Sequence, residues 1–147
     1  MPQIRTADAT WQGDLTSGSG TIDYVGSGAF SRMPVTWHAR TEASDGQTSP
    51  EELLAAAHAA CFSMALSSRL AKAGHPAAKL SVRATVTFDK GDAGWKVASS
   101  ALRVTGDVPG MSAPDFRALA DDAKENCPIS QALKGNVALS VEASLVA

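Results

Sequence analysis

The sequence predicts an α+β fold, in which strands and helices come in separate blocks along the chain. Residues 50–73 form an alanine-rich apolar run that is typical of a buried helix, with start and stop signals at its ends. Residues 80–88 alternate apolar and polar side chains, which is the pattern of a half-buried strand. Strands and helices do not alternate one by one, so we expect antiparallel sheets packed on helices rather than a βαβ fold.

Composition and charge restrict the classes of function. The chain has 147 residues, and we predict a single domain over residues 1–147. The net charge of -2 argues against nucleic acid or an anionic membrane as a partner. Residues 1–8 contain no apolar segment and no run approaches transmembrane length, so we expect a cytoplasmic protein. Cysteines in that compartment matter through reactivity or metal binding rather than as cross-links.

The first third of the chain contains three short strand patterns. Residues 11–13 and 21–25 read as two strands joined by a turn around residues 17–20. Residues 35–41 also alternate apolar and polar side chains, which predicts a third extended segment. Arg40 would then point away from the tryptophan on the same segment.

The long helix has clear boundary signals. Ser49 can serve as its N-cap, Pro50 suits the first helical position, and Glu52 completes a capping box. We expect the helix to run to about Ala73, where Gly74 can end it.

The faces of this helix predict an assembly. The helix is apolar on nearly every face between residues 53 and 66, and such a helix must be buried all round. One small sheet can cover only one side. We therefore predict that a second subunit covers the other side.

The second half of the chain predicts a hairpin, a helix and a final strand. Residues 89–94 read as the hairpin loop, and the apolar phase of the return strand shifts near Ser99, which predicts a β-bulge. A capping pattern at Ser112 opens a helix that ends near Asn126. Residues 137–145 alternate as a closing strand.

The first of two cysteines, Cys61, lies inside the long apolar helix. A free thiol there can simply pack as a small hydrophobic group. Burial raises the pKa of such a thiol, and Cys61 lies about three turns from the helix start, too far for the helix dipole to help. A reactive Cys61 therefore needs a cation that another segment supplies.

The second cysteine, Cys127, precedes Pro128 at the end of the second helix. It can be the last residue of that helix, continuing its apolar face. Alternatively, Pro128 opens a short helix over residues 128–133, and Cys127 is its N-cap, where free N–H groups favour a thiolate.

A metal site is a competing interpretation of the same residues. His58 and Cys61 are three residues apart on one helix, and Cys127, His38 or His75 could complete a zinc site. No C-x-x-C or H-x-x-x-H motif supports it, so we expect no metal. We expect His58 to be structural.

Arg40 and Glu51 are the remaining candidates for a functional pair. A carboxylate such as Glu51 stabilises the first turn of a helix through its charge alone. Arginine on a strand is most commonly solvated. The pattern by itself leaves the structural and functional interpretations of both residues open.

Several segments resemble the OsmC family of osmotically induced peroxidases. Residues 49–66, SPEELLAAAHAACFSMAL, closely resemble the core helix of that family. Residues 11–14 with 18–21 resemble its first hairpin, residues 89–94 its hairpin loop, and residues 124–133 its second-cysteine motif. The resemblance covers nearly the whole chain in order, with both cysteines in place.

The resemblance implies a cysteine-based peroxidase that reduces organic hydroperoxides in oxidative or osmotic stress. It also implies an intertwined homodimer, in which antiparallel sheets wrap around a long buried central helix. Cys61 matches the peroxidatic cysteine of the family and Cys127 the resolving cysteine. Arg40 and Glu51 match its guanidinium–carboxylate pair. The related Ohr group carries its arginine in the first hairpin loop, where this chain has residues 17–19 without one, so the chain resembles OsmC proper.

The family resemblance also implies a mechanism. Arg40 lowers the pKa of Cys61, and Glu51 orients the guanidinium. Peroxide converts Cys61 to a sulfenic acid, which Cys127 condenses into a disulfide. An external dithiol reductant resets the pair, and no cofactor is expected. A preference for alkyl or fatty-acyl peroxides is expected from apolar walls formed by Leu53, Leu54, Phe62, Met33 and Pro34.

A different class of function stays open from the residues alone. The chain could be a non-enzymatic dimer that binds an apolar ligand or a metal, with both thiols structural. That hypothesis predicts that either cysteine can become serine with no loss beyond stability. The peroxidase hypothesis predicts that Cys61→Ser abolishes turnover.

Overall fold

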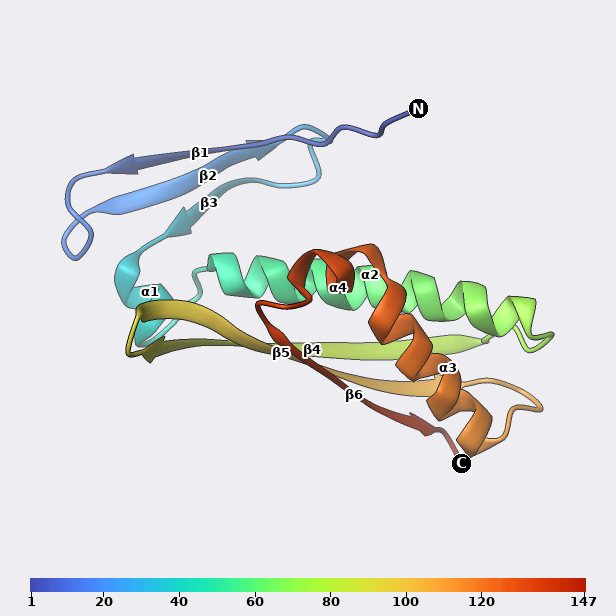
Figure 1. Ribbon diagram of the computed structural model, residues 1–147. Helices are drawn as coiled ribbons and strands as arrows, with labels where there is room; N and C mark the ends of the chain where they lie inside the picture. Colours follow the sequence, from blue (N-terminus) through green and yellow to red (C-terminus); the bar gives the residue numbers. More distant parts are fainter. The chain divides into compact units, whose positions relative to one another are not determined.

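The structure is a computed structural model that describes residues 1–147 (Figure 1). The chain divides into two compact units, residues 1–53 and residues 54–147. The boundary falls one turn inside the long helix, which therefore contributes its start to the first unit and its remainder to the second. The single-domain expectation stays a prediction.

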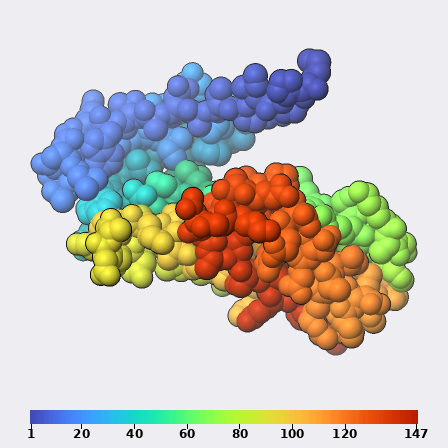
Figure 2. Space-filling model, viewed as in Figure 1, coloured from blue at the N-terminus to red at the C-terminus, as the bar shows by residue number.

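The first unit is an antiparallel sheet followed by a short helix. Its strands are β1 (Ala7–Gln12), β2 (Ser19–Val25) and β3 (Ser31–Val35), in the order β1-β2-β3. The two predicted N-terminal strands are thus confirmed. The atoms of β1 and β2 form the elongated blue slab in Figure 2. Every side chain of β1 is exposed, so this sheet has little core of its own.

The predicted extended segment over residues 35–41 is wrong for most of its length, because Val35 ends β3 and residues 37–41 are helical. A helix, α1 (Trp37–Thr41), follows β3, because the Thr36 hydroxyl oxygen accepts the Ala39 N–H at 3.1 Å and caps the first turn. Residues three apart on a helix lie on one face. The guanidinium of Arg40 accordingly lies 5.9 Å from the centre of the Trp37 ring instead of pointing away from it.

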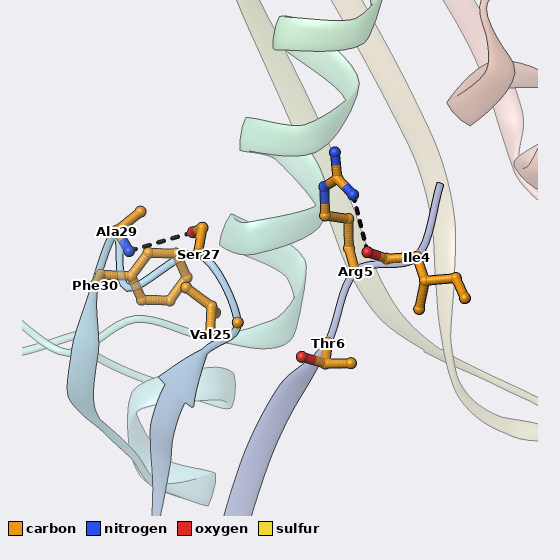
Figure 3. Close-up of a pocket in the computed structure, with 8 residues that line it drawn as sticks. Ile4, Arg5, Thr6, Val25, Ser27, Ala29 and Phe30 are labelled. Carbon is orange, nitrogen blue, oxygen red and sulfur yellow. Dashed lines mark hydrogen bonds between the residues drawn. The ribbon is translucent and has the colours of Figure 1, made fainter. Parts of the chain in front are cut away.

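A pocket of about 650 Å³ lies within the first unit (Figure 3). Its walls come from the N-terminal segment, from the end of β2 and from the turn that follows it. The Arg5 guanidinium donates a hydrogen bond to the Ile4 carbonyl at 2.9 Å, and the Ser27 hydroxyl accepts the Ala29 N–H at 3.2 Å. None of the predicted site residues lines this pocket.

The long helix, α2 (Pro50–Lys72), begins and ends where the sequence predicts, to within a residue. The Ser49 hydroxyl oxygen accepts the Glu52 N–H at 3.1 Å, which confirms the predicted N-cap. The return half of the capping box is replaced, because the Glu52 carboxylate instead accepts the Thr48 hydroxyl at 3.0 Å. Gly74, with φ +85°, ends the helix in the left-handed conformation that glycine tolerates best.

The second unit contains a mixed three-stranded sheet in the order β4-β5-β6. The strands β4 (Lys79–Gly91) and β5 (Gly94–Asp107) form an antiparallel hairpin. β6 (Ala138–Leu145) pairs with β5 in parallel, so the sheet departs from the all-antiparallel expectation. The crossover runs through α3 (Ala113–Asn126) and α4 (Pro128–Leu133), as a parallel connection requires.

Two details of the hairpin refine the prediction. The strands continue into the expected loop, because Gly91 still pairs with Gly94 and leaves only two residues in the turn. The β-bulge is present close to the predicted place. Thr87 pairs with Ser99 and Phe88 with Val97, so one extra residue of β5 lies between these pairs.

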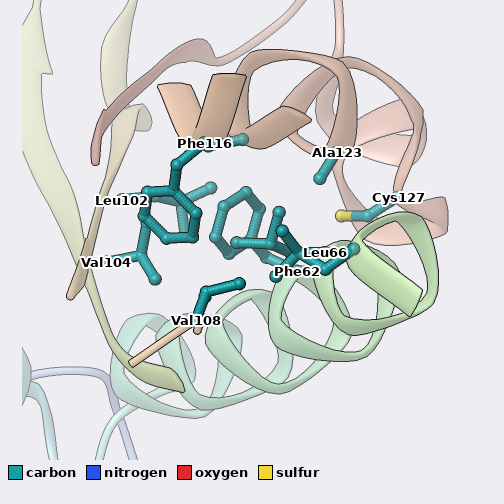
Figure 4. Close-up of a cluster of buried hydrophobic side chains, with 10 residues drawn as sticks. Phe62, Leu66, Leu102, Val104, Val108, Phe116, Ala123 and Cys127 are labelled. Carbon is teal, nitrogen blue, oxygen red and sulfur yellow. The ribbon is translucent and has the colours of Figure 1, made fainter. Parts of the chain in front are cut away.

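The core of the second unit lies between the sheet and the helices, which share one face of it (Figures 1 and 4). α2 contributes Phe62, Leu66 and Leu70 at a spacing of four residues, and all three are fully buried. Burying a side chain of this size stabilises the fold by about 1.5–3 kcal/mol. β5 and α3 supply most of the other buried groups, namely Leu102, Val104, Val108, Phe116, Ala120, Ala123 and Cys127.

Within the single chain, α2 is buried along one face only and not all round. Ala56, Ala60 and Met64 follow one another at helical spacing on an exposed stripe, and Met64 is 70% exposed. By length and composition α2 is long and apolar enough to span a membrane, so the expectation that no run approaches transmembrane length is wrong. The core helix of a soluble protein passes the same test. The second subunit expected over the exposed stripe stays a prediction.

Candidate active site

Cys61 lies on α2 one residue before the buried Phe62, so its side chain is at the edge of the core and half-buried. Desolvation raises the pKa of its thiol above the ordinary value of 9.0. The backbone N–H of Ile129 acts in the opposite direction, and the neighbouring Cys127 thiol adds to the increase in the pKa. The two thiols are therefore neighbours within the second unit, although they are 66 positions apart along the chain.

Cys127 is fully buried where α3 ends and α4 begins. It is the N-cap of α4, as one of the two interpretations of the sequence predicts, and its Sγ accepts the Ser130 N–H at 3.3 Å. Its own N–H is bonded to the Ala123 carbonyl at 2.9 Å, which closes α3. Figure 4 shows the sulfur directed into the buried cluster. Two helix ends thus fix the position of this thiol.

Arg40 and Glu51 form a two-pronged ion pair within the first unit. Arg40 Nη2 lies 2.7 Å from Glu51 Oε1, and Arg40 Nε lies 3.0 Å and 3.1 Å from the two carboxylate oxygens. The Glu51 side chain is only 9% exposed. A planar guanidinium held by both oxygens of one carboxylate has a fixed orientation. The start of α2 and the short helix α1 bring these residues together.

His58 occupies a position that the sequence did not reveal. It is fully buried, its Nδ1 lies 2.6 Å from the Ser100 hydroxyl, and its Nε2 lies 2.8 Å from the Ser130 hydroxyl. The Ser130 hydroxyl also lies 3.1 Å from Cys127 Sγ. A sequence signal was present for one link only, because Ser130 follows an N-cap cysteine by three residues, the spacing of a capping contact.

The structure thus brings the four predicted site residues together as two pairs. Arg40 is paired with Glu51 in the first unit, and Cys61 neighbours Cys127 in the second. No group of three or more His, Cys, Asp or Glu side chains is arranged to hold a metal ion. Phe62 is fully buried in the core, so the expectation that it forms a wall for substrate is wrong.

This arrangement can support thiol redox chemistry. Two free thiols that interact with each other are candidates for oxidation to a disulfide. The desolvated Cys61 is a poor nucleophile on its own because only the thiolate reacts. A guanidinium beside it would reverse the effect of burial on its pKa.

The chain matches known proteins over most of its length. Residues 42–142 match the family described as OsmC-like protein. Peroxiredoxin OsmC of Escherichia coli is 41% identical over 138 residues, which are 94% of this chain and 95% of the relative. The organic hydroperoxide resistance protein OhrA of Bacillus subtilis is 35% identical over 105 residues, 70% of this chain and 72% of the relative.

Solved structures give the same result for the fold. An organic hydroperoxide resistance protein from Elizabethkingia anophelis has a TM-score of 0.75 at 25% identity, covering 99% of this chain and 100% of that one. The organic hydroperoxide resistance protein OhrB of Bacillus subtilis has a TM-score of 0.72 at 26% identity, covering 94% and 97% of the two chains. The chain therefore belongs to the OsmC-like protein family.

Proposed function

We propose that this protein is a thiol-dependent peroxidase, which reduces organic hydroperoxides to alcohols through Cys61 and Cys127. Relatives named peroxiredoxin and organic hydroperoxide resistance protein support an enzyme of hydroperoxide defence. The observation that carries the proposal is that Cys61 and Cys127, distant in sequence, are neighbouring free thiols. Structural cysteines have no need to be neighbours.

In the first step, the Cys61 thiolate attacks the terminal oxygen of the hydroperoxide. The O–O bond breaks, the sulfur is oxidised to a sulfenic acid, and the alkoxide takes up a proton and leaves as an alcohol. Arg40 supplies the cation that lowers the pKa of Cys61 and stabilises the negative charge on the leaving oxygen. Glu51, paired with Arg40 through both oxygens, orients the guanidinium.

In the second step, Cys127 attacks the sulfenic sulfur of Cys61. A disulfide forms and water leaves, which protects Cys61 from oxidation to the sulfinic acid. A dithiol reductant then restores both thiols by exchange through a mixed disulfide. All the electrons come from thiols, so the proposed cycle uses no cofactor.

The expected assembly and location form part of the proposal. An intertwined homodimer would cover the exposed stripe of α2 at Ala56, Ala60 and Met64. A reducing cytoplasm would supply the dithiol reductant. Partners other than hydroperoxide, reductant and a second copy are not expected.

Replacing each cysteine tests the proposal directly. With t-butyl hydroperoxide and a dithiol reductant, we expect Cys61→Ser to lose turnover completely. Cys127→Ser should react once and then become over-oxidised at Cys61, which mass spectrometry detects. Ser63→Ala, which alters a hydroxyl two residues along the same helix, is the matched control and should keep turnover. Wild-type turnover in Cys61→Ser would refute the proposal and favour a binding protein with structural thiols.

A further inference from the structure

A continuous chain of buried polar groups ends at the sulfur of Cys127. It runs from Ser100 on β5, through the ring of His58 on α2, to Ser130 on α4 and then to Cys127. The successive distances are 2.6 Å, 2.8 Å and 3.1 Å. All four side chains are fully buried. Three separate elements of the fold therefore converge on one thiol.

The hydrogen atoms of this chain can be arranged in two complete ways. In one, the Cys127 S–H donates to Ser130, the Ser130 hydroxyl donates to His58 Nε2, and Nδ1–H of the ring donates to the Ser100 oxygen. In the other, every donor and acceptor is reversed, and the Ser130 hydroxyl donates to the sulfur. A neutral imidazole has one donor and one acceptor nitrogen, so it fits either arrangement. Both leave the buried atoms satisfied, in keeping with the absence of unpaired buried polar side-chain atoms.

The charge state of the ring agrees with this geometry. Burial lowers the pKa of His58 below its ordinary value of 6.5, so the ring is neutral at neutral pH. A neutral ring can accept a proton, which an imidazolium cannot do. Burying a polar ring also costs free energy that an apolar residue on this core face would avoid.

We propose that Ser130 and His58 form a proton relay, which holds the Cys127 thiol and receives its proton while Cys127 attacks the sulfenic acid of Cys61. Ser130 contacts the reacting sulfur directly. His58 acts through Ser130 and is a positioning residue, and Ser100 holds the far side of its ring. This inference rests on the function proposed above and assigns the second step of the cycle to particular groups.

The step balances without an added reagent. The Cys127 proton moves to Ser130 as the Ser130 hydroxyl proton moves to His58 Nε2. The electron pair left on the Cys127 sulfur forms the S–S bond with Cys61, and the S–O bond of the sulfenic acid breaks. The leaving hydroxide takes back the proton from the ring through the Ser130 hydroxyl and becomes water. The ring ends neutral, and both sulfurs are in the disulfide.

Rapid kinetics on two variants tests the relay. Ser130→Ala removes the connecting hydroxyl, and His58→Gln keeps a hydrogen-bonding group but cannot take up a proton. After mixing with t-butyl hydroperoxide, we expect both variants to form the Cys61 sulfenic acid at the wild-type rate. Disulfide formation should slow by about 10²-fold or more, the usual contribution of a positioned acid–base group. A dimedone adduct of Cys61 should accumulate in both, and the solvent isotope effect on disulfide formation should disappear.

A destabilised variant separates this role from a merely structural one. Leu70→Ala makes a cavity in the same core without touching the relay. We expect it to lower the melting temperature but to leave the rate of disulfide formation unchanged. If Leu70→Ala slows that step as much as Ser130→Ala does, or if Ser130→Ala and His58→Gln leave it unchanged, the relay is overturned.

A second probe avoids peroxide, so that the two proposals can fail separately. Dithiodipyridine oxidises Cys61 to a mixed disulfide, and attack by Cys127 then releases a second equivalent of the coloured thione. We expect Ser130→Ala and His58→Gln to slow the second release only. If the wild-type protein does not react with peroxide but the two variants still slow the second release, the proposed function is refuted and the relay is retained. An unaltered second release would overturn the relay whatever the result with peroxide.

Discussion

The reactivity of Cys61 depends on opposing influences on a single thiol. Desolvation raises its pKa, and the Cys127 thiol raises it further, whereas only the Ile129 N–H lowers it. These groups alone leave the residue protonated and slow to react at neutral pH. A nearby guanidinium is the simplest way to favour the thiolate. The activity proposed for Cys61 therefore depends on Arg40 lowering the pKa of its thiol.

Replacement of Arg40 should suppress the reactivity of Cys61 without unfolding the protein. We expect Arg40→Ala to raise the pH at which iodoacetamide alkylates Cys61, by at least one pKa unit, or about 1.4 kcal/mol. Arg40→Lys retains the charge but not the two-pronged contact with Glu51, so it should give an intermediate value. Circular dichroism checks that both variants are folded. An unchanged alkylation profile in Arg40→Ala would contradict the activation by Arg40.

His58 should make the folded state sensitive to acid. Burial holds the pKa of His58 below 6.5 in the folded protein. As the pH falls through 6.5, His58 therefore becomes protonated in the unfolded chain while it stays neutral in the folded chain. Stability is therefore full above pH 6.5 and decreases as the pH falls towards the lowered folded-state pKa. The expected loss is about 1.4 kcal/mol for each unit by which the pKa is lowered.

Urea unfolding at several pH values between about 7.5 and 5 measures this effect. His58→Gln should be less stable at neutral pH, because it removes the imidazole from the buried hydrogen-bond network. Its free energy of unfolding should, however, decrease less steeply as the pH falls. Leu70→Ala changes no titratable group, so its free energy of unfolding should depend on pH with the wild-type slope. Equal slopes for His58→Gln and the wild type would show that His58 is not held neutral by the fold.

At the level of elements, α2 carries groups from both pairs of the proposed site. Glu51 lies in its first turn and Cys61 further along, and the helix start depends on the cap at Ser49. The cap satisfies an N–H group that would otherwise have no partner within the helix. Loss of the cap should therefore disturb Glu51 before it disturbs Cys61.

The Ser49 cap should contribute measurably to stability. We expect Ser49→Ala to lower the free energy of unfolding by about 1 kcal/mol, within the usual range for a lost N-cap. Ser49→Asp retains an oxygen acceptor and should stay close to the wild type. Chemical denaturation measures both values. A loss of stability in Ser49→Asp as large as that in Ser49→Ala would mean that the hydroxyl contact is not what stabilises the helix start.

The elements that the sequence predicted well are those with local signals. The cap and glycine stop define α2, and period-two alternation defines β4 and β6. α1 was missed because residues 35–41 alternate like a strand, while the decisive contact is a single Thr36 hydroxyl. The parallel pairing of β6 also has no local signal, because it depends on which strand edge the chain reaches after α3 and α4.

In the candidate site, too, some features have a local signal in the sequence and others do not. The N-cap position of Cys127 was one of two interpretations that Pro128 allowed, and the roles of both cysteines, Arg40 and Glu51 come from the resemblance and stay predictions. The contact of His58 with Ser100 and Ser130 was not predictable, because these serines are 42 and 72 positions away along the chain. Pairings of this kind depend on the register of β5 and the placement of α4, which only the folded chain defines.

At the scale of the whole molecule, several large apolar side chains are exposed on the single chain. Met64 on α2 is 70% exposed, and in the first unit Trp11 and Tyr24 are 41% and 54% exposed. Single exposed apolar residues are common, but an apolar stripe on a helix and a sheet with few buried side chains are each typical of a subunit interface. A second copy of the chain is the cover that we propose.

A charge on the exposed stripe of α2 should weaken this assembly. We expect wild-type protein to sediment as a dimer and Met64→Glu to sediment as a monomer or to dissociate at higher concentration, because an unpaired carboxylate is costly to bury. Ser81→Glu adds the same charge to an exposed position on β4 and should leave the dimer intact. Analytical ultracentrifugation distinguishes these results. A wild-type monomer would contradict the proposed assembly.

The most direct test of the central claim is a free-thiol count before and after one equivalent of t-butyl hydroperoxide, with intact mass recorded on the same samples. We predict prompt loss of both thiols and a decrease in mass equal to two hydrogen atoms, which identifies a disulfide between Cys61 and Cys127. Thiols and mass that stay unchanged would contradict the claim, and both cysteines would then be structural residues of a binding protein.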